Sequence, residues 1–165
     1  MAVKGAGNES ALALEWAANR TLHTRMPSPR WLYHGTLASN VQEILHRGLA
    51  TGSFWGTRRM AEHWARRRAE EASRDGDRAA VLIRRPLASF DPGHLLWDGF
   101  MDEEPVWFGF QVEADKQAAC ARAQGNWEES LAILESVWCR QGVTIQVGDV
   151  IRLRQVEMAG RQMGI

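Results

Sequence analysis

The sequence predicts an α+β fold, in which a split core of short, mostly antiparallel strands is flanked by helices. Short β-prone runs and amphipathic helical segments follow one another irregularly, without the regular alternation of a βαβ array. The 165 residues are 45% hydrophobic and 24% charged, which is typical of one folded domain with a core. We therefore expect a single domain over 1–165, with an N-terminal helix and linker over 1–29 and a frayed tail over 155–165.

The chain begins with a predicted helix and the first core strand. Ser10 to His23 is amphipathic, has Ser10 as a plausible cap and ends before Pro27. Arg30 to His34 is β-prone and stops at Gly35. We expect this run to be the first strand of the core.

A helix, a short strand and a long helix come next. Asn40 to His46 carries apolar residues on one face, and Gly48 stands where a helix would stop. Thr51 to Thr57 is short and aromatic, which predicts a brief strand or an extended loop. Thr57 then caps a predicted helix that runs to about Arg74.

The second half of the chain contains the remaining predicted elements. Ala79 to Ile83 has the composition of a buried strand, and His94 to Trp97 is a second candidate strand. Pro105 to Val112 is strongly aromatic and predicts another strand. Gln124 to Arg140 has the period of a helix, and Val143 to Leu153 should form one or two final strands.

Composition argues against several classes of protein. Twenty basic residues balance twenty acidic ones, which disfavours a dedicated nucleic-acid binder and predicts a solvated face for the arginines of 58–68. Cys120 and Cys139 have neither metal-ligand spacing nor a disulfide framework, so no metal is expected. We find no signal peptide or membrane span in the sequence, and expect a cytoplasmic protein that may still be exported by a specialised system.

A series of short motifs resembles the diphtheria-toxin-type ADP-ribosyltransferases, a group that includes the poly(ADP-ribose) polymerases and small bacterial relatives. The series covers about Trp31 to Val112, roughly half of the chain. Its members, in order, are Leu32-Tyr33-His34-Gly35-Thr36, a helix ending at Gly48-Leu49, Gly52-Ser53-Phe54-Trp55, and a helix through Ala61 to Ala65. The resemblance implies the fold of that family and NAD as substrate.

His34, Gly35 and Thr36 are the first candidate NAD-binding residues. A strand-end imidazole can hydrogen-bond a ribose hydroxyl, and a following glycine lets the backbone approach a ligand without a Cβ. The resemblance implies that His34 contacts the adenosine ribose and that the Gly35 backbone pairs with the nicotinamide carboxamide. The alternative for His34 is a purely structural histidine.

The aromatic candidates are Phe54, Trp55, His63 and Trp64. Aromatic faces can orient the nicotinamide ring while it becomes a leaving group. Phe54 stands where the family commonly has Tyr and resembles the first stacking residue, while His63 or Trp64 resembles the second. The alternative is that these residues belong to the core.

The catalytic acid is expected directly before a late strand. Cleavage of the nicotinamide bond builds oxocarbenium character, which a nearby carboxylate stabilises. Glu103 and Glu104 precede the predicted strand at Pro105, and the resemblance favours Glu104 over Glu103. The alternative is an acidic turn in solvent.

These features predict an NAD-dependent ADP-ribosyltransferase, a glycosyltransferase that moves ADP-ribose to a macromolecular acceptor, protein or nucleic acid. Such an enzyme would be a toxin, an effector or a phage-encoded modifier, for which a neutralising partner protein is conceivable. One alternative is a catalytically silent module of the same fold that binds NAD, ADP-ribose or a protein. Another is an enzyme like the RNA 2′-phosphotransferases, which share this fold.

Overall fold

The computed structural model describes residues 27–72, 79–102 and 112–153. The predicted helix over 10–23, most of the predicted strand over 105–112 and the predicted tail over 155–165 lie outside these residues. The described part is a mixed α and β fold with a six-stranded antiparallel sheet in the order β4-β5-β2-β1-β3-β6. This confirms the predicted class of short antiparallel strands with flanking helices.

The chain divides by its internal contacts into two compact units, each described by itself below. The described residues of the first unit are 27–29, 95–102 and 112–138. Those of the second unit are 30–72, 79–94 and 139–153. That the chain behaves as a single domain stays a prediction, because a division by contacts does not say whether the units unfold together.

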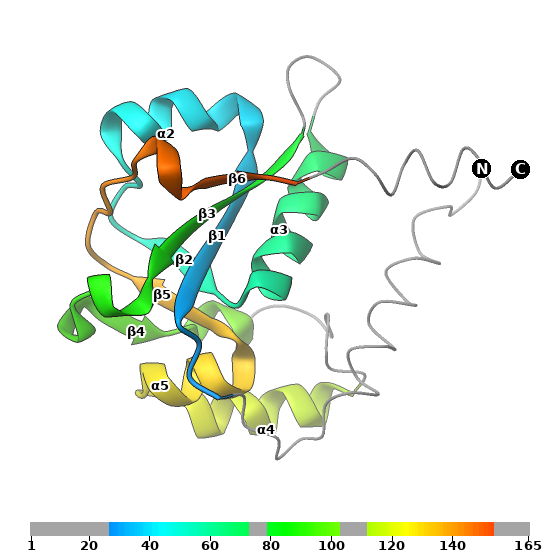
Figure 1. The fold of residues 1–165 in the computed structure, drawn as a ribbon. Coiled ribbons are helices and arrows are strands. Elements are labelled where there is room, and N and C mark those ends of the chain that lie inside the picture. The colour runs from blue at the N-terminus through cyan, green and yellow to red at the C-terminus, as the bar shows by residue number, and fades with distance from the viewer. Residues whose placement is uncertain (1–26, 73–78, 103–111, 154–165) are drawn as a thin grey trace, which may run out of the picture. The chain divides into compact units, whose positions relative to one another are not determined.

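The second unit is built around β1 (Trp31–Leu37), which extends the predicted first strand by three residues. It pairs along its whole length with β3 (Ala80–Pro86), and β3 pairs in turn with β6 (Val150–Arg152). Figure 1 shows β1, β3 and β6 side by side. Val81, Leu82 and Ile83 at the centre of β3 are fully buried, as a central strand requires.

Helix α3 (Arg58–Glu71) covers one face of β1 and β3. It begins as predicted, because the Thr57 hydroxyl accepts a hydrogen bond from the Met60 backbone N–H at 3.4 Å. Its inward side consists of small residues, Ala61 and Ala65, which pack against Leu82. This packing brings the helix close to the strand.

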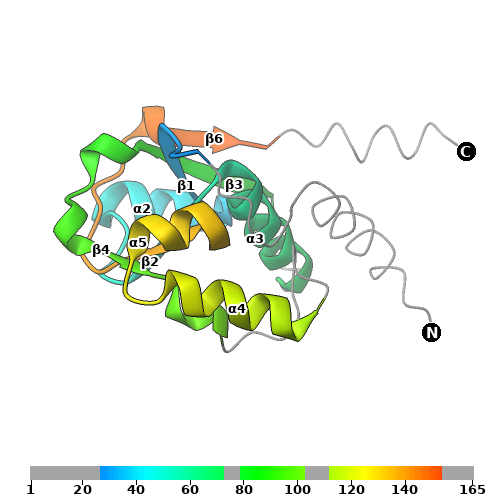
Figure 2. The same cartoon turned by 90° about the horizontal axis from the view of Figure 1, so that it is seen from below.

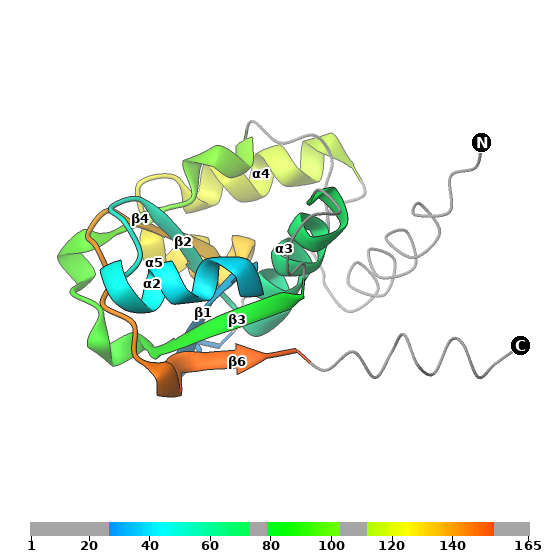
Figure 3. The ribbon, with the colours of Figure 1, turned by 90° about the horizontal axis from the view of Figure 1, so that it is seen from above.

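The remaining elements of the second unit are short. Helix α2 (Val41–Arg47) follows a turn of 3₁₀ helix and ends at Gly48, which has a φ of 74° and is therefore favoured as glycine. Strand β2 (Ser53–Gly56) confirms the first of the two alternatives for 51–57, a brief strand rather than an extended loop. Figure 3 shows α2 together with β3 and β6.

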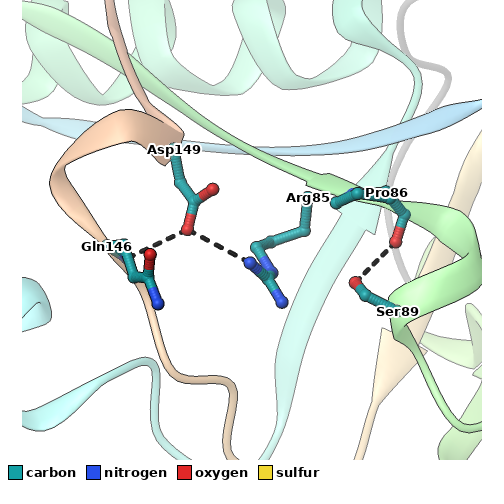
Figure 4. Close-up of polar contacts among 5 residues, drawn as sticks. All are labelled: Arg85, Pro86, Ser89, Gln146 and Asp149. Atoms are coloured by element: carbon teal, nitrogen blue, oxygen red, sulfur yellow. Dashed lines mark hydrogen bonds and ion pairs between the residues drawn. The ribbon is translucent and has the colours of Figure 1, made fainter.

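An ion pair connects the end of β3 to the turn before β6. Asp149 accepts a hydrogen bond from the Gln146 backbone N–H at 2.9 Å, and the same oxygen lies 3.4 Å from Nη1 of Arg85 (Figure 4). Nε of Arg85 is buried without a hydrogen-bond partner. The Arg85–Asp149 ion pair thus fixes the segment between Val143 and β6 to β3. This segment begins at the isolated β-bridge between Leu49 and Val143.

The first unit contains β4 (Leu95–Trp97), α4 (Glu113–Ala123), α5 (Trp127–Glu129) and β5 (Ser136–Cys139), whose last residue belongs to the second unit. Figure 2 shows α4 and α5 close together. Strand β4 confirms the prediction at 94–97. Helix α4 was not predicted, because its many alanines give no clear apolar stripe.

The predicted helix over 124–140 is wrong in its second half. Helix α5 continues as a turn of π-helix over Ser130–Leu134, and Glu135 then adopts a left-handed conformation with φ of 61°. A left-handed residue ends a helix, so the chain turns and continues as β5. The helical period could not reveal this break, because every residue from Ser130 to Val137 is buried.

Candidate functional site

His34 lies in the middle of β1, opposite Ile83 of β3. A Cβ built on the neighbouring Gly35 would meet Ala65 of α3 at 3.0 Å, so Gly35 faces α3. Side chains alternate along a strand, and His34 therefore faces away from α3. Its ring centroid lies 5.6 Å from that of Trp55.

The His34 ring connects β1 to β2. Its Nδ1 lies 2.7 Å from the backbone carbonyl oxygen of Phe54. The register between β1 and β2 comprises one Cα pair, Tyr33 with Gly56, whereas that between β1 and β3 comprises seven. The imidazole thus adds a side-chain hydrogen bond from β1 to the backbone of β2.

This hydrogen bond fixes the protonation of the ring. A carbonyl oxygen only accepts, so Nδ1 carries the proton and donates it. Burial lowers the pKa of His34 from 6.5 to about 4, the bond to Phe54 opposes this shift, and the charge of Arg68 adds to it. Near neutral pH the ring is therefore neutral, and Nε2 is an acceptor for a hydroxyl or an N–H group.

Gly35 and Thr36 are both buried. A Cβ at Gly35 would clash with the carbonyl oxygen of Ala61, so the close approach of α3 by itself requires glycine here. The Thr36 hydroxyl accepts a hydrogen bond from the side-chain amide of Asn40 at 3.3 Å. Both residues thus have structural roles that the sequence did not reveal.

Phe54 and Trp55 point to opposite faces of the sheet. Nε1 of Trp55 donates to the hydroxyl of Ser53 at 2.8 Å, which places these two side chains on one side of β2. Trp55 is 1% exposed and packs edge-on against Phe90 at 5.1 Å, as a core residue does. The partly buried Phe54 lies on the other side, so its ring does not share a face with the His34 ring.

His63 and Trp64 lie on α3 and are partly buried. Their rings make an edge contact at 5.5 Å, and the Arg67 guanidinium lies 5.3 Å from the centre of the Trp64 ring. They are on the helix that covers the face opposite His34. Of the predicted site residues, the structure thus brings together His34, the Phe54 backbone and Trp55.

The acidic candidates Glu103 and Glu104 lie outside the described residues. The criterion that selected them, a carboxylate directly before a late strand, is also met by Glu135, which precedes β5. Glu135 is fully buried and has the left-handed backbone noted above. Sequence reasoning missed it because the segment was assigned to a helix.

Glu135 adjoins a buried polar network in the first unit. The Ser130 hydroxyl accepts from the Asp98 backbone N–H at 2.9 Å and donates to the Ser136 carbonyl at 2.6 Å. The Ser136 hydroxyl donates to the Asp98 carboxylate at 2.7 Å. Glu135 thus combines a fully buried side chain with a left-handed backbone, directly after a π-helical turn.

Within the described ranges, no group of three or more His, Cys, Asp or Glu side chains could hold a metal ion. None of the helices described there is long and apolar enough to cross a membrane.

Comparison with protein-family models, curated proteins and solved structures found no match to this chain.

Proposed function

We propose that this protein is an NAD-dependent ADP-ribosyltransferase that binds the ADP-ribose part of NAD through His34. The observation that carries the proposal is the neutral His34 ring, which donates from Nδ1 to the Phe54 carbonyl and so presents Nε2 as an acceptor. A ribose hydroxyl is a suitable donor to such an atom. We also propose that the sheet and its flanking helices form an ADP-ribosyltransferase-like core.

The order of elements supports this proposal. Strand β1 carries His34, helix α2 ends at Gly48, strand β2 carries Phe54, and helix α3 follows at once. The resemblance implies this order of strand, helix, strand and helix.

In the proposed reaction the bond between the ribose C1′ and the nicotinamide nitrogen breaks, and nicotinamide leaves with the bonding electrons. The acceptor's nucleophile forms the new bond to C1′ and loses its proton. A carboxylate stabilises the oxocarbenium character of the transition state. Glu104 is the candidate for this carboxylate, with Glu103 as the alternative.

Release of nicotinamide from NAD by the purified protein tests the proposal. Glu104→Gln and Glu103→Gln keep the side-chain shape and remove the charge. We expect one of them to lower kcat by about 100-fold or more, with the other close to the wild type. If both variants release nicotinamide at the wild-type rate, neither carboxylate is catalytic.

A second candidate is an RNA 2′-phosphotransferase-like enzyme. The specific observation in its favour is an excess of arginine in the second unit, whose described residues hold eleven arginines and six carboxylates. NAD-dependent loss of a 2′-phosphate from RNA would establish this activity. Binding of NAD without any turnover would instead indicate a catalytically silent module.

A further inference from the structure

Charge is distributed unevenly over this neutral chain. The described residues of the second unit hold eleven arginines, no lysine and six carboxylates, a formal charge of +5. Those of the first unit hold two basic and seven acidic residues, a formal charge of −5. The second unit alone therefore has the excess positive charge that attracts a polyanion.

Two of these arginines lie over one aromatic ring, that of Trp31 at the start of β1. The Arg84 guanidinium lies 4.2 Å from the centre of the Trp31 ring, and that of Arg30 lies 5.9 Å from it. Both distances are within the range of a cation–π contact. The Trp31 ring is partly exposed, so it remains in reach of a ligand.

Further aromatic and basic residues lie on the same face of β1, the face toward α3. Tyr33 and Trp31 both face the α3 side of β1, and Arg84 stands opposite Tyr33 in the register. Hydrogen bonds from Arg58 to Glu62 and Tyr33 raise the pKa of Arg58, which keeps its charge. Because Arg58 is paired with Glu62 at 3.0 Å, we leave it out and call Arg30, Trp31, Tyr33 and Arg84 the Trp31 cluster.

We infer that the Trp31 cluster binds single-stranded nucleic acid. Arginine suits this partner better than lysine, because its planar group both pairs with phosphate oxygens and stacks on bases. Indole and guanidinium planes that are already stacked offer a platform for an unpaired base. An acidic protein could pair with the arginines but has no bases to stack on the Trp31 ring. A duplex keeps its bases stacked inside the helix, where the Trp31 ring cannot reach them.

Arg85, the neighbour of Arg84 in the sequence, does not belong to the cluster. It faces the other side of β3 and is paired with Asp149 at 3.4 Å. Alternation along the strand thus separates a structural arginine from a binding one. A basic run that looks uniform in the sequence has two different roles.

The test is binding of fluorescent 12-nucleotide single strands, DNA and RNA, to the full chain without NAD, at several salt concentrations. We expect binding that weakens with salt. Arg84→Gln should weaken it about tenfold and lower the slope of log Kd against log salt by about 1. Trp31→Ala should weaken it by about tenfold, whereas Trp31→Phe, which keeps a stacking ring, should retain most of the affinity.

Arg47→Gln is the matched control. Arg47 is exposed on α2 of the same unit and pairs with Glu43, so its loss removes one charge outside the cluster. The inference is overturned if Arg47→Gln and Arg84→Gln weaken binding equally, or if Trp31→Ala has no effect. It is also overturned if a duplex or a polyglutamate chain of the same charge binds as tightly as the single strands.

This inference does not require the proposed enzymatic activity, and the test separates the two. Binding of single strands without nicotinamide release would leave the inference standing and count against the enzyme. Release of nicotinamide with no binding of single strands would support the enzyme and overturn the inference. If both hold, single-stranded nucleic acid becomes the acceptor to examine first.

Discussion

His34 combines a partly buried ring with one hydrogen bond to the Phe54 carbonyl, and this environment decides how the ring responds to acid. Its folded-state pKa of about 4 lies below the ordinary 6.5. Between these values the unfolded chain binds a proton that the folded protein does not. Protonation therefore favours the unfolded state in this range.

The free energy of unfolding should consequently fall as the pH is lowered through this window. The contribution of His34 amounts to about 2 kcal/mol between pH 7 and pH 5, above the range in which most carboxylates titrate. Urea denaturation at several pH values would measure it. His34→Gln should reduce this pH dependence more than the control His46→Gln, which removes an exposed histidine of α2. Equal slopes in the wild type and both variants would contradict this expectation.

Gly35 is a second residue whose identity has a physical cause in the structure. Gly35→Ala should lower the free energy of unfolding by about 1 to 3 kcal/mol, because the added methyl group overlaps the backbone of α3. Gly148→Ala is the control, since a Cβ there has nothing within 4 Å. Thermal or urea denaturation would measure both, and similar effects of the two changes would contradict this packing.

At the scale of the element, the segment from α5 to β5 depends on one hydroxyl. Ser130 satisfies a backbone N–H of Asp98 and a backbone carbonyl of Ser136, both in buried surroundings. Ser130→Ala should therefore cost about 2 kcal/mol, because two buried polar groups lose their partner. Ser89→Ala, which removes an exposed hydroxyl bonded to Pro86, should cost much less in the same denaturation experiment.

The elements also show what sequence periodicity can and cannot predict. The starts of α3 and β2 could be predicted, because Thr57 is a regular cap and glycines flank the short strand. The break at Glu135 could not, since glutamate is a good helix former and its left-handed backbone arises from tertiary packing. Because 124–140 was predicted as one helix, the sequence did not indicate that Glu135 directly precedes a strand.

The neutral net charge of the whole chain conceals an uneven distribution of charge. A total of zero argued against nucleic-acid binding, although the described residues of the two units carry formal charges of +5 and −5. Composition cannot reveal this separation, because it depends on which segments the chain brings together. The candidate site shows the same limit: the sequence selected His34, but only the structure supplies its tautomer and separates the faces of Phe54 and Trp55.

We propose that NAD binds through Nε2 of a neutral His34, and calorimetric titration of the protein with NAD would measure this binding. We expect binding that changes little between pH 8 and pH 5.5, because the ring stays neutral over this range. His34→Ala should weaken it by about tenfold or more, whereas His46→Ala should not. Equal affinity of the wild type and His34→Ala, or no binding of NAD at all, would mean that NAD is not bound through His34.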